Sequence, residues 1–314
     1  MQPEILSVTA LRPEVQRELE DRFTVHRLDT ATDPEALLDR VGGSVRGVVT
    51  DGGENLNAAF LSRLPQVGFI SCSSAGYDGI DTGELVRRGI RLGNTSTALA
   101  DDVADVAVLL LMAARRDLVR AHQHVTSGAW ADGDYPLQRS FTGGHLGIVG
   151  MGGIGQAVAR RAEAFGKEIA YFARGPKAWL PYRYFADLTE LAHWSSDFVI
   201  CLPGGDRTRH MVGAAVIHAL GPRGVLVNVG RGSVVDEAAL IAALAQGNLG
   251  AAGLDVFDGE PTRDPKLVQL PNITAYPHHA SGTIEARSAM ARLALENLTA
   301  YFDGRQPPCE VTLA

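Results

Sequence analysis

The sequence predicts an α/β protein with two domains, each built on a parallel sheet that helices cover on both faces. Short apolar segments of strand length alternate with amphipathic segments along the whole chain, which is the pattern of βα units. The chain has 314 residues, whereas single hydrophobic cores stop growing near about 250–300 residues. A glycine-rich turn near residue 150 follows enough chain to form a separate domain.

The first half of the chain shows strands and helices in alternation. Four short apolar segments are expected to be strands: 5–8, 47–49, 68–71 and 90–92. Four segments between them have apolar residues at helical spacing: 13–21, 34–41, 56–64 and 82–88. Because strands joined through helices pair in parallel, this half should form one sheet covered on both faces.

The second half repeats the alternation. Its expected strands lie near 146–150, 168–172, 198–202, 225–229, 251–256 and 272–275. The clearest helix between them is 236–246, which Asp236 can cap at the N-terminus. A long helical pattern from 99 to about 124 links the two halves. The last helical stretch, 283–302, follows the final strand, and we expect this helix, or its C-terminal half, to cross back to the first domain.

A glycine fingerprint opens the second sheet. Gly150, Gly152 and Gly155 form G-x-G-x-x-G behind the apolar run 146–149, and the amphipathic segment 156–165 follows. Strand, tight turn and helix in this order predict a dinucleotide site, with the phosphates at the N-terminus of the helix. The first glycine permits the turn, the second lets backbone amides approach a pyrophosphate, and the third allows close packing. A glycine-rich turn without a ligand is the alternative.

Composition limits the classes of partner. The net charge is −7 and no basic block occurs, which argues against nucleic acid or an anionic membrane as partner. The longest apolar run, 106–114, is too short to span a bilayer, which needs about 20 residues, and no export signal is visible. Three cysteines without C-x-x-C spacing argue against a disulfide framework and against a metal site. We therefore expect a cytoplasmic protein.

Three charged side chains follow predicted strands of the second half: Arg231, Glu260 and His278. Ligands of open parallel sheets bind beyond the carboxyl ends of the strands. Beside a dinucleotide, these residues would suit the reduction of a 2-oxo acid. Arg231 would bind the substrate carboxylate and polarise the carbonyl, and His278 would donate a proton as hydride reaches the carbon. Glu260 would favour the imidazolium and orient the ring. Taken singly, each residue has a structural alternative, as a loop arginine, a solvated turn glutamate or a packed histidine.

Four motifs in order, GMGGIG, NVGRGSVVDE, GLDVFDGEP and PHHAS, resemble those of the D-isomer-specific 2-hydroxyacid dehydrogenase family, closest to its NADPH-dependent glyoxylate/hydroxypyruvate reductases. Segment 74–81 resembles the family's substrate loop, so the resemblance covers nearly the whole chain. It implies a flavodoxin-like substrate domain, 1–97 plus 287–314, and a Rossmann cofactor domain, 98–286. The active site would lie in a cleft between them, and the cofactor domains would form a homodimer.

The resemblance also implies roles for single residues. Catalysis falls to the arginine, glutamate and histidine already named, with His278 preferred over His279 because it directly follows Pro277. The amides of Ala75 and Gly76, with Arg231 and His278, would bind the substrate. Further cofactor contacts, beyond the three fingerprint glycines, are implied at Gly153, Ile154, Leu202, Pro203, Thr208, Val229, Gly230 and Asp255. Asp255 matches the position that binds the nicotinamide carboxamide.

The choice of cofactor depends on Ala173 and Arg174. They end the second strand of the nucleotide half, where NAD-specific folds place an acidic residue for the ribose 2′-hydroxyl. An arginine can instead pair with a 2′-phosphate, and hydrogen bonds to charged groups contribute about 1.5–3 kcal/mol, roughly a 10- to 150-fold preference. We therefore expect NADPH, with NADH as the lesser cofactor. In the alternative, Arg174 faces solvent or stacks on adenine.

Together these observations predict reduction of a small 2-oxo acid, glyoxylate- or hydroxypyruvate-like, to the D-2-hydroxy acid. Two alternatives use the same fold. One is a nucleotide-sensing scaffold like the C-terminal-binding-protein corepressors, which this chain's lack of a basic patch or long disordered tail disfavours. The other is a dehydrogenase of the same family that acts on a different donor such as phosphite, which would need a different set of polar groups.

Overall fold

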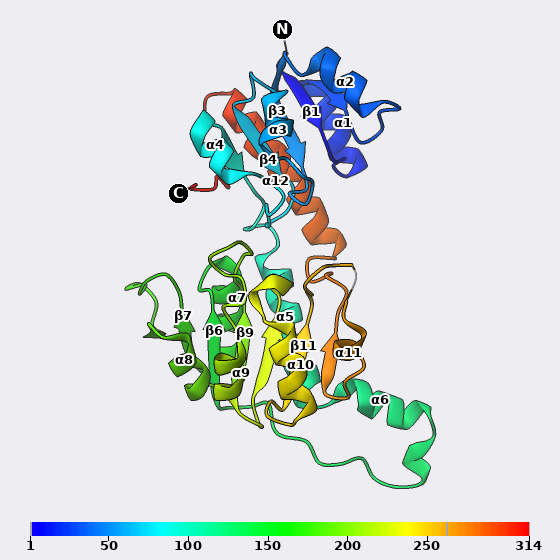
Figure 1. The fold of residues 1–314 in the computed structure, drawn as a ribbon, viewed down its shortest axis with the longest axis vertical. Helices are drawn as coiled ribbons and strands as arrows, with labels where there is room; N and C mark the ends of the chain where they lie inside the picture. The colour runs from blue at the N-terminus through cyan, green and yellow to red at the C-terminus, as the bar shows by residue number, and fades with distance from the viewer. Residues whose placement is uncertain (1, 262, 314) are drawn as a thin grey trace. The chain divides into compact units, whose positions relative to one another are not determined.

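The computed structural model describes residues 2–261 and 263–313 (Figure 1). The chain divides into two compact units. The first unit comprises Met1–Leu99 and Ser281–Ala314, and the second unit comprises Ala100–Ala280. The chain therefore changes unit after residues 99 and 280, compared with the changes after 97 and 286 that the sequence suggested.

The first unit is built on a five-stranded sheet with the order β2-β1-β3-β4-β5. All neighbouring strands pair in parallel. The strands are β1 (Glu4–Ser7), β2 (Thr24–Arg27), β3 (Val45–Thr50), β4 (Phe69–Cys72) and β5 (Arg91–Gly93). The helices are α1 (Pro13–Arg22), α2 (Pro34–Val41), α3 (Ala58–Ser62), α4 (Thr82–Arg88) and α12 (Ile284–Phe302).

The last helix, α12, packs in the first unit although it is far from the rest of that unit in sequence. It contacts β4, where the hydroxyl of Ser71 donates to the carbonyl oxygen of Ala294 at 2.7 Å. Asn297, fully buried on the same helix, donates to the carbonyl oxygen of Asn94 and accepts from the amide of Cys309. These three buried hydrogen bonds fix α12 against the sheet, because breaking them would leave unpaired polar groups in the core.

The second unit is built on a seven-stranded parallel sheet with the order β12-β11-β10-β9-β6-β7-β8. The strands are β6 (His145–Val149), β7 (Glu168–Phe172), β8 (Arg183–Phe185), β9 (Asp197–Ile200), β10 (Val225–Asn228), β11 (Ala251–Leu254) and β12 (Ile273–Ala275). The helices are α5 (Ala100–Arg115), α6 (Leu118–Thr126), α7 (Gly153–Glu163), α8 (Leu188–Trp194), α9 (Ala214–Leu220), α10 (Glu237–Ala245) and α11 (Pro265–Val268). Two parallel sheets with helical connections confirm the predicted fold class.

Helix α5 provides much of the apolar cover of the second sheet. It packs against α7, β10 and β11, with Leu110 and Leu111 buried. The approach to β11 is close, because a Cβ at Gly253 would lie only 2.9 Å from the Cβ of Leu110. This packing places the helix directly across the strands whose carboxyl ends carry the predicted catalytic residues.

The long helical pattern from 99 to 124 is wrong as a single helix, because α5 ends at Arg115 and α6 begins at Leu118. Asp117 between them has a φ of +50°, a left-handed conformation that cannot continue a helix. Arg115 also holds the end of α5 in place, since its guanidinium forms a buried ion pair with Asp197. The second cation of this buried group is Lys167, 2.8 Å from the same carboxylate.

Residues 116–144, here called the arm, contain helix α6 and extend away from the sheet of the second unit (Figure 1). None of the residues of α6 is buried. A short 3-10 helix, Ala129–Ala131, and an extended segment complete the arm before β6. No helix of the described residues has both the length and the apolar character needed to cross a membrane.

Candidate active site

The glycine fingerprint forms the turn between β6 and α7. Gly150 has a φ of +99°, which a side chain would strain, and a Cβ at Gly155 would lie 2.1 Å from the carbonyl oxygen of Gly150. At Gly152 there is open space, because a Cβ added there would have no atom within 4 Å apart from those of Gly152 and its chain neighbours. No side chain caps the helix that follows. This open, positively polarised helix start, which includes Gly153 and Ile154, fits the phosphates of a dinucleotide.

The turn after β10 carries Arg231, and Asn228 determines its shape. The Oδ1 atom of Asn228 accepts from the amide of Gly230 at 3.0 Å, and its Nδ2 atom donates to the carbonyl oxygen of Arg231 at 2.9 Å. Asn228 is buried, so this side chain acts as an internal brace of the turn. The guanidinium of Arg231 donates from Nη1 to the carbonyl oxygen of Gly230 at 2.8 Å. The sequence reasoning missed Asn228, although it stands in the same motif.

The turn after β11 carries Glu260, whose two oxygens have different partners. Oε1 accepts from the amide of Phe257 at 2.7 Å, and Oε2 lies 2.5 Å from Nδ1 of His278. Burial raises the pKa of Glu260. The hydrogen bonds from His278 and Phe257 and the charges of His278 and Arg231 outweigh this effect, so the pKa lies below its ordinary value. Glu260 is therefore a carboxylate at neutral pH, so the proton of the short bond belongs to Nδ1 of the histidine.

The turn after β12 presents His278 in a left-handed backbone conformation, with a φ of +50°. Its amide donates to the carbonyl oxygen of Asp255 at 2.7 Å. The carboxylate of Asp255 accepts from the next two amides, of His279 at 2.8 Å and of Ala280 at 3.2 Å. Burial raises the pKa of Asp255, whereas the two amide hydrogen bonds lower it. Asp255 thus shapes the turn that aims His278, a role that the sequence did not indicate.

The three predicted catalytic residues come together at one edge of the second sheet. They follow β10, β11 and β12, which are consecutive in the sheet. Glu260 and His278 are in direct contact, and Arg231 is near enough for its charge to lower the pKa of Glu260. About half of the His278 side chain, 48 %, is exposed, so the ring is accessible on the side away from Glu260. This arrangement can bind an anion and deliver one proton.

The strand ends beside the fingerprint lie close to one another. Leu202 and Pro203 follow β9, and a Cβ at Gly230 would lie 2.4 Å from the carbonyl oxygen of Leu202. Val229 is buried next to Gly230, and its amide donates to the carbonyl oxygen of Ile200 on β9. The hydroxyl of Thr208 donates to the carbonyl oxygen of Pro203 at 2.9 Å, which closes this loop on itself. A cofactor contact at these positions stays a prediction.

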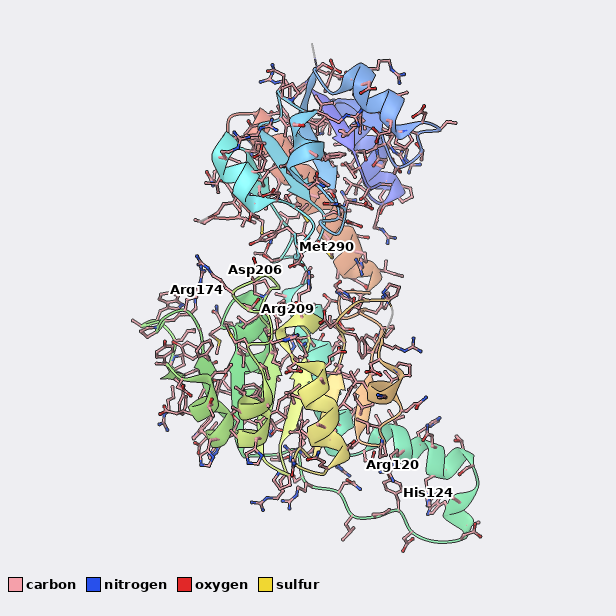
Figure 2. The ribbon with its side chains drawn as sticks, viewed as in Figure 1. Arg120, His124, Arg174, Asp206, Arg209 and Met290 are labelled. Carbon is pink, nitrogen blue, oxygen red and sulfur yellow. The ribbon has the colours of Figure 1, made fainter. Side chains whose placement is uncertain are left out.

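Ala173 and Arg174 directly follow β7, at the far side of the fingerprint from the catalytic turns. Arg174 is exposed and extends outward from this loop (Figure 2). Within the described part of the chain, its guanidinium has no hydrogen-bond acceptor or ion-pair partner. The loop itself is anchored, because the hydroxyl of the buried Tyr171 accepts from the amide of Lys177 at 2.7 Å. An available cation on an anchored loop fits an anionic ligand group.

In the first unit, two carbonyl groups of the loop after β4, which the sequence predicts to bind substrate, accept hydrogen bonds. The carbonyl oxygen of Ala75 accepts from Nδ2 of Asn94 at 2.9 Å, and that of Gly76 accepts from the hydroxyl of Ser74 at 2.6 Å. No acceptor is found for the amides of Ala75 and Gly76 among residues 2–261 and 263–313. Amides held in this way can receive an anion.

Comparisons with known proteins agree with this geometry. The family model described as "D-isomer specific 2-hydroxyacid dehydrogenase, NAD binding domain" matches residues 108–280. Glyoxylate/hydroxypyruvate reductase A of Arabidopsis thaliana is 41% identical, and hydroxyphenylpyruvate reductase of Plectranthus scutellarioides is 40% identical, each over 96% of both chains. The structure also resembles that of an NADPH-dependent glyoxylate/hydroxypyruvate reductase from Sinorhizobium meliloti in complex with NADP and malonate. The TM-score is 0.89, with 36% identity over 99% of this chain and 97% of that one.

These matches extend over nearly the whole chain and include the turns that carry the arginine, the glutamate and the histidine. The family match, the two parallel sheets and the Glu260–His278 pair each support the same assignment. The chain therefore belongs to the D-isomer-specific 2-hydroxyacid dehydrogenases, a family of nicotinamide-dependent oxidoreductases that interconvert 2-oxo and 2-hydroxy acids.

Proposed function

We propose that this enzyme reduces a small 2-oxo acid, glyoxylate- or hydroxypyruvate-like, to the D-2-hydroxy acid with NADPH. The hydrogen-bonded pair of Glu260 and His278 beside Arg231 is the observation that carries the proposal. The names of the Arabidopsis and Sinorhizobium relatives support the substrate, and the complex of the latter with NADP supports the cofactor. The Plectranthus relative, named for an aromatic 2-oxo acid, makes substrate size the property to test first.

When bound, the reduced nicotinamide supplies the hydride that goes to the carbonyl carbon. Arg231 binds the substrate carboxylate and draws electron density toward the carbonyl oxygen. Because Nδ1 of His278 is engaged with Glu260, its Nε2 atom is the one that donates a proton to that oxygen. Glu260 remains ionised and holds the ring in place. The product gains one hydride on carbon and one proton on oxygen, and the histidine is left neutral.

The remaining predicted residues bind the two ligands. We assign the carboxylate of the 2-oxo acid to the amides of Ala75 and Gly76 as well as to Arg231. The fingerprint turn receives the pyrophosphate, and Ala173 and Arg174 receive the ribose and its 2′-phosphate. The loops that start at Leu202 and Val229 and the carboxylate of Asp255 bind the nicotinamide half. In these assignments the first unit contributes backbone amides to substrate binding, and the second unit provides the cofactor site together with Arg231, Glu260 and His278.

The experiment is steady-state kinetics with purified protein. Glyoxylate, hydroxypyruvate, pyruvate and 4-hydroxyphenylpyruvate are each assayed with NADPH and with NADH, and the configuration of the product is determined by chiral chromatography. We expect the highest kcat/KM for glyoxylate or hydroxypyruvate with NADPH, and a D product wherever C2 is a stereocentre. A clear preference for the aromatic substrate or for NADH would contradict the corresponding part of the proposal.

We further propose that the active form is a homodimer assembled through the second unit. The arm 116–144 exposes apolar side chains along its length: Leu118, Val119, Val125, Trp130 and Leu137. Groups of exposed apolar side chains of this kind mark interaction surfaces. The arm itself has few buried residues, so a second copy that covers it would shield surface that the single chain leaves in water.

A further inference from the structure

We propose that Glu237 is a positioning residue that holds the turn of Glu260 in the geometry that His278 requires. The proposal rests on the proposed reduction, and it concerns a residue that touches neither the histidine nor the arginine. Glu237 is the first residue of α10, and its Oε1 atom accepts from the amide of Asp258 at 2.7 Å.

Two neighbouring amides of the turn have separate carboxylate acceptors. The amide of Phe257 donates to Glu260 within the turn, and the amide of Asp258 donates to Glu237 on another element, each at 2.7 Å. The first hydrogen bond fixes the Glu260 side chain relative to its own backbone. The second fixes that backbone relative to α10. Without the second hydrogen bond, the whole turn could move relative to α10, and the carboxylate of Glu260 would move with it.

A second contact holds the same turn from the arginine side. A Cβ at Gly232 would lie 1.9 Å from the carbonyl carbon of Phe257 and 2.3 Å from the amide nitrogen of Asp258. Gly232 directly follows Arg231, and Glu237 lies five residues further along the same segment. Segment 231–237 therefore contacts the Glu260 turn at two places: Gly232 packs closely against it, and Glu237 accepts a hydrogen bond from it. These two contacts fix the position of the segment that carries Arg231 relative to the turn that carries Glu260.

The charges around Glu237 come from the turn and from the loops packed on it. Asp258 is paired with Arg209, which Figure 2 labels, at 3.5 Å and lies 3.9 Å from His210. Burial raises the pKa of Glu237, and the carboxylates of Asp258, Asp264 and Glu260 raise it further, while the amide of Asp258 opposes them. Protonation would leave one carboxyl oxygen able to accept from Asp258. The positioning role therefore needs an acceptor at this place rather than a negative charge.

This reasoning separates two substitutions. Glu237→Gln retains a carbonyl oxygen that can accept from the Asp258 amide, so we expect it to keep most of the wild-type rate. Glu237→Ala removes the acceptor, and we expect kcat for 2-oxo acid reduction to fall about 10- to 100-fold, as small displacements of catalytic groups do. The binding of NADPH, followed by its fluorescence, should be unchanged in both variants. Glu190→Ala, which removes an exposed first-turn glutamate of α8, is the matched control.

A double-mutant cycle with Glu260→Gln tests the route of the effect. If Glu237 acts through Glu260, then adding Glu237→Ala to Glu260→Gln lowers kcat no further. The conservative variant gives an independent measure, because Glu237→Gln keeps the acceptor that Glu237→Ala removes. The kcat of Glu237→Gln and of Glu190→Ala should therefore follow that of the wild type.

The outcomes are distinct. Additive losses in the cycle, or a loss in Glu237→Gln equal to that in Glu237→Ala, would overturn the positioning role. A thermal unfolding scan and NADPH binding show whether each variant is folded, and Glu237→Gln retains the test if the alanine variant is not. If the wild-type protein itself reduces no 2-oxo acid with either cofactor, the proposed function fails before Glu237 is tested.

Discussion

In the proposed mechanism, the Glu260–His278 pair determines which ring nitrogen holds the transferable proton. The lowered pKa of Glu260 keeps its carboxylate ionised, and Nδ1 is used in the bond between them. The first prediction is that His278→Gln, which keeps a polar group of similar size, lowers kcat about 10²- to 10⁴-fold, the usual effect of losing a positioned acid. Steady-state kinetics and NADPH titration measure it. Full activity in the variant would mean that another group donates the proton.

The second prediction concerns stability. The pKa of Glu260 is lower in the folded chain than in the unfolded chain, so its ionisation stabilises the fold at pH values above the ordinary carboxyl range. This contribution is lost as the pH falls from about 5 through the lowered value. In Glu260→Gln the unfolding temperature should therefore depend less on pH on the acid side. Differential scanning fluorimetry across pH measures this, and identical acid profiles for both proteins would count against the ion pair.

The third prediction concerns the choice of cofactor. Arg174 is exposed on an anchored loop, and a 2′-phosphate there would gain a charged hydrogen bond. In Arg174→Ala we expect the ratio of kcat/KM for NADPH to that for NADH to fall about 10- to 150-fold. Arg183→Ala, on the neighbouring edge strand, is a control for loss of positive charge. An unchanged ratio in Arg174→Ala would show that Arg174 does not bind the 2′-phosphate of NADPH.

The proximity of Arg231, Glu260 and His278 could be predicted from the sequence, because each follows an apolar strand and has a distinctive side chain, while their catalytic roles stay predictions. The residues that hydrogen-bond to the backbone of these turns were harder to predict. Asn228 and Asp255 act through backbone amides that come near only when the turns are folded. Glu237 acts on an amide 21 residues away, and no local pattern reveals that pairing. Hydrogen bonds between turns are a property of the fold rather than of the motif.

At the level of elements, the sequence predicted the interior strands and the edge strands β5 and β12, but it did not predict the edge strands β2 and β8. β2 and β8 pair with one neighbour each, and their side chains are mostly exposed or half-buried. An edge strand that faces water needs no apolar run, so its sequence resembles a loop. The break after α5 was missed for another reason. The helical spacing continues on both sides of Asp117, and only its backbone angle ends the first helix.

The fourth prediction belongs to the turn after β10. Asn228→Ala removes both hydrogen bonds that shape this turn and leaves the Gly230 amide without its acceptor. We expect a loss of stability of about 1–3 kcal/mol and a higher KM for the 2-oxo acid, because Arg231 is no longer held in place. Urea unfolding and steady-state kinetics measure the two effects. A stability loss with an unchanged KM would show that Asn228 has no bearing on the arginine.

At the scale of the whole molecule, the chain folds as two units on parallel sheets, and the first unit receives the last helix of the chain. The sequence could suggest this discontinuity because the second sheet has no further strand for the final helix to join. The arm 116–144 was not anticipated. Its apolar side chains fit the helical pattern of the linker, and the pattern does not show that they stay exposed.

The fifth prediction is the assembly. If the exposed apolar side chains of the arm form the dimer interface, replacing Trp130 and Leu137 with serine should raise the fraction of single chains at micromolar concentration. Sedimentation velocity measures the mass in solution. Trp179→Ser, which changes another exposed tryptophan outside the arm, is the control. A wild-type protein that sediments as a single chain would contradict the dimer.

The central claim is that His278, held by Glu260, delivers the proton when a 2-oxo acid is reduced. The most direct measurement is a single-turnover experiment in which the protein, loaded with NADPH, is mixed with excess glyoxylate or hydroxypyruvate and the loss of nicotinamide absorbance is followed. The account predicts rapid oxidation by the wild type and a rate at least about 100-fold slower in His278→Gln at equal NADPH occupancy. Equal rates in the two proteins would contradict it.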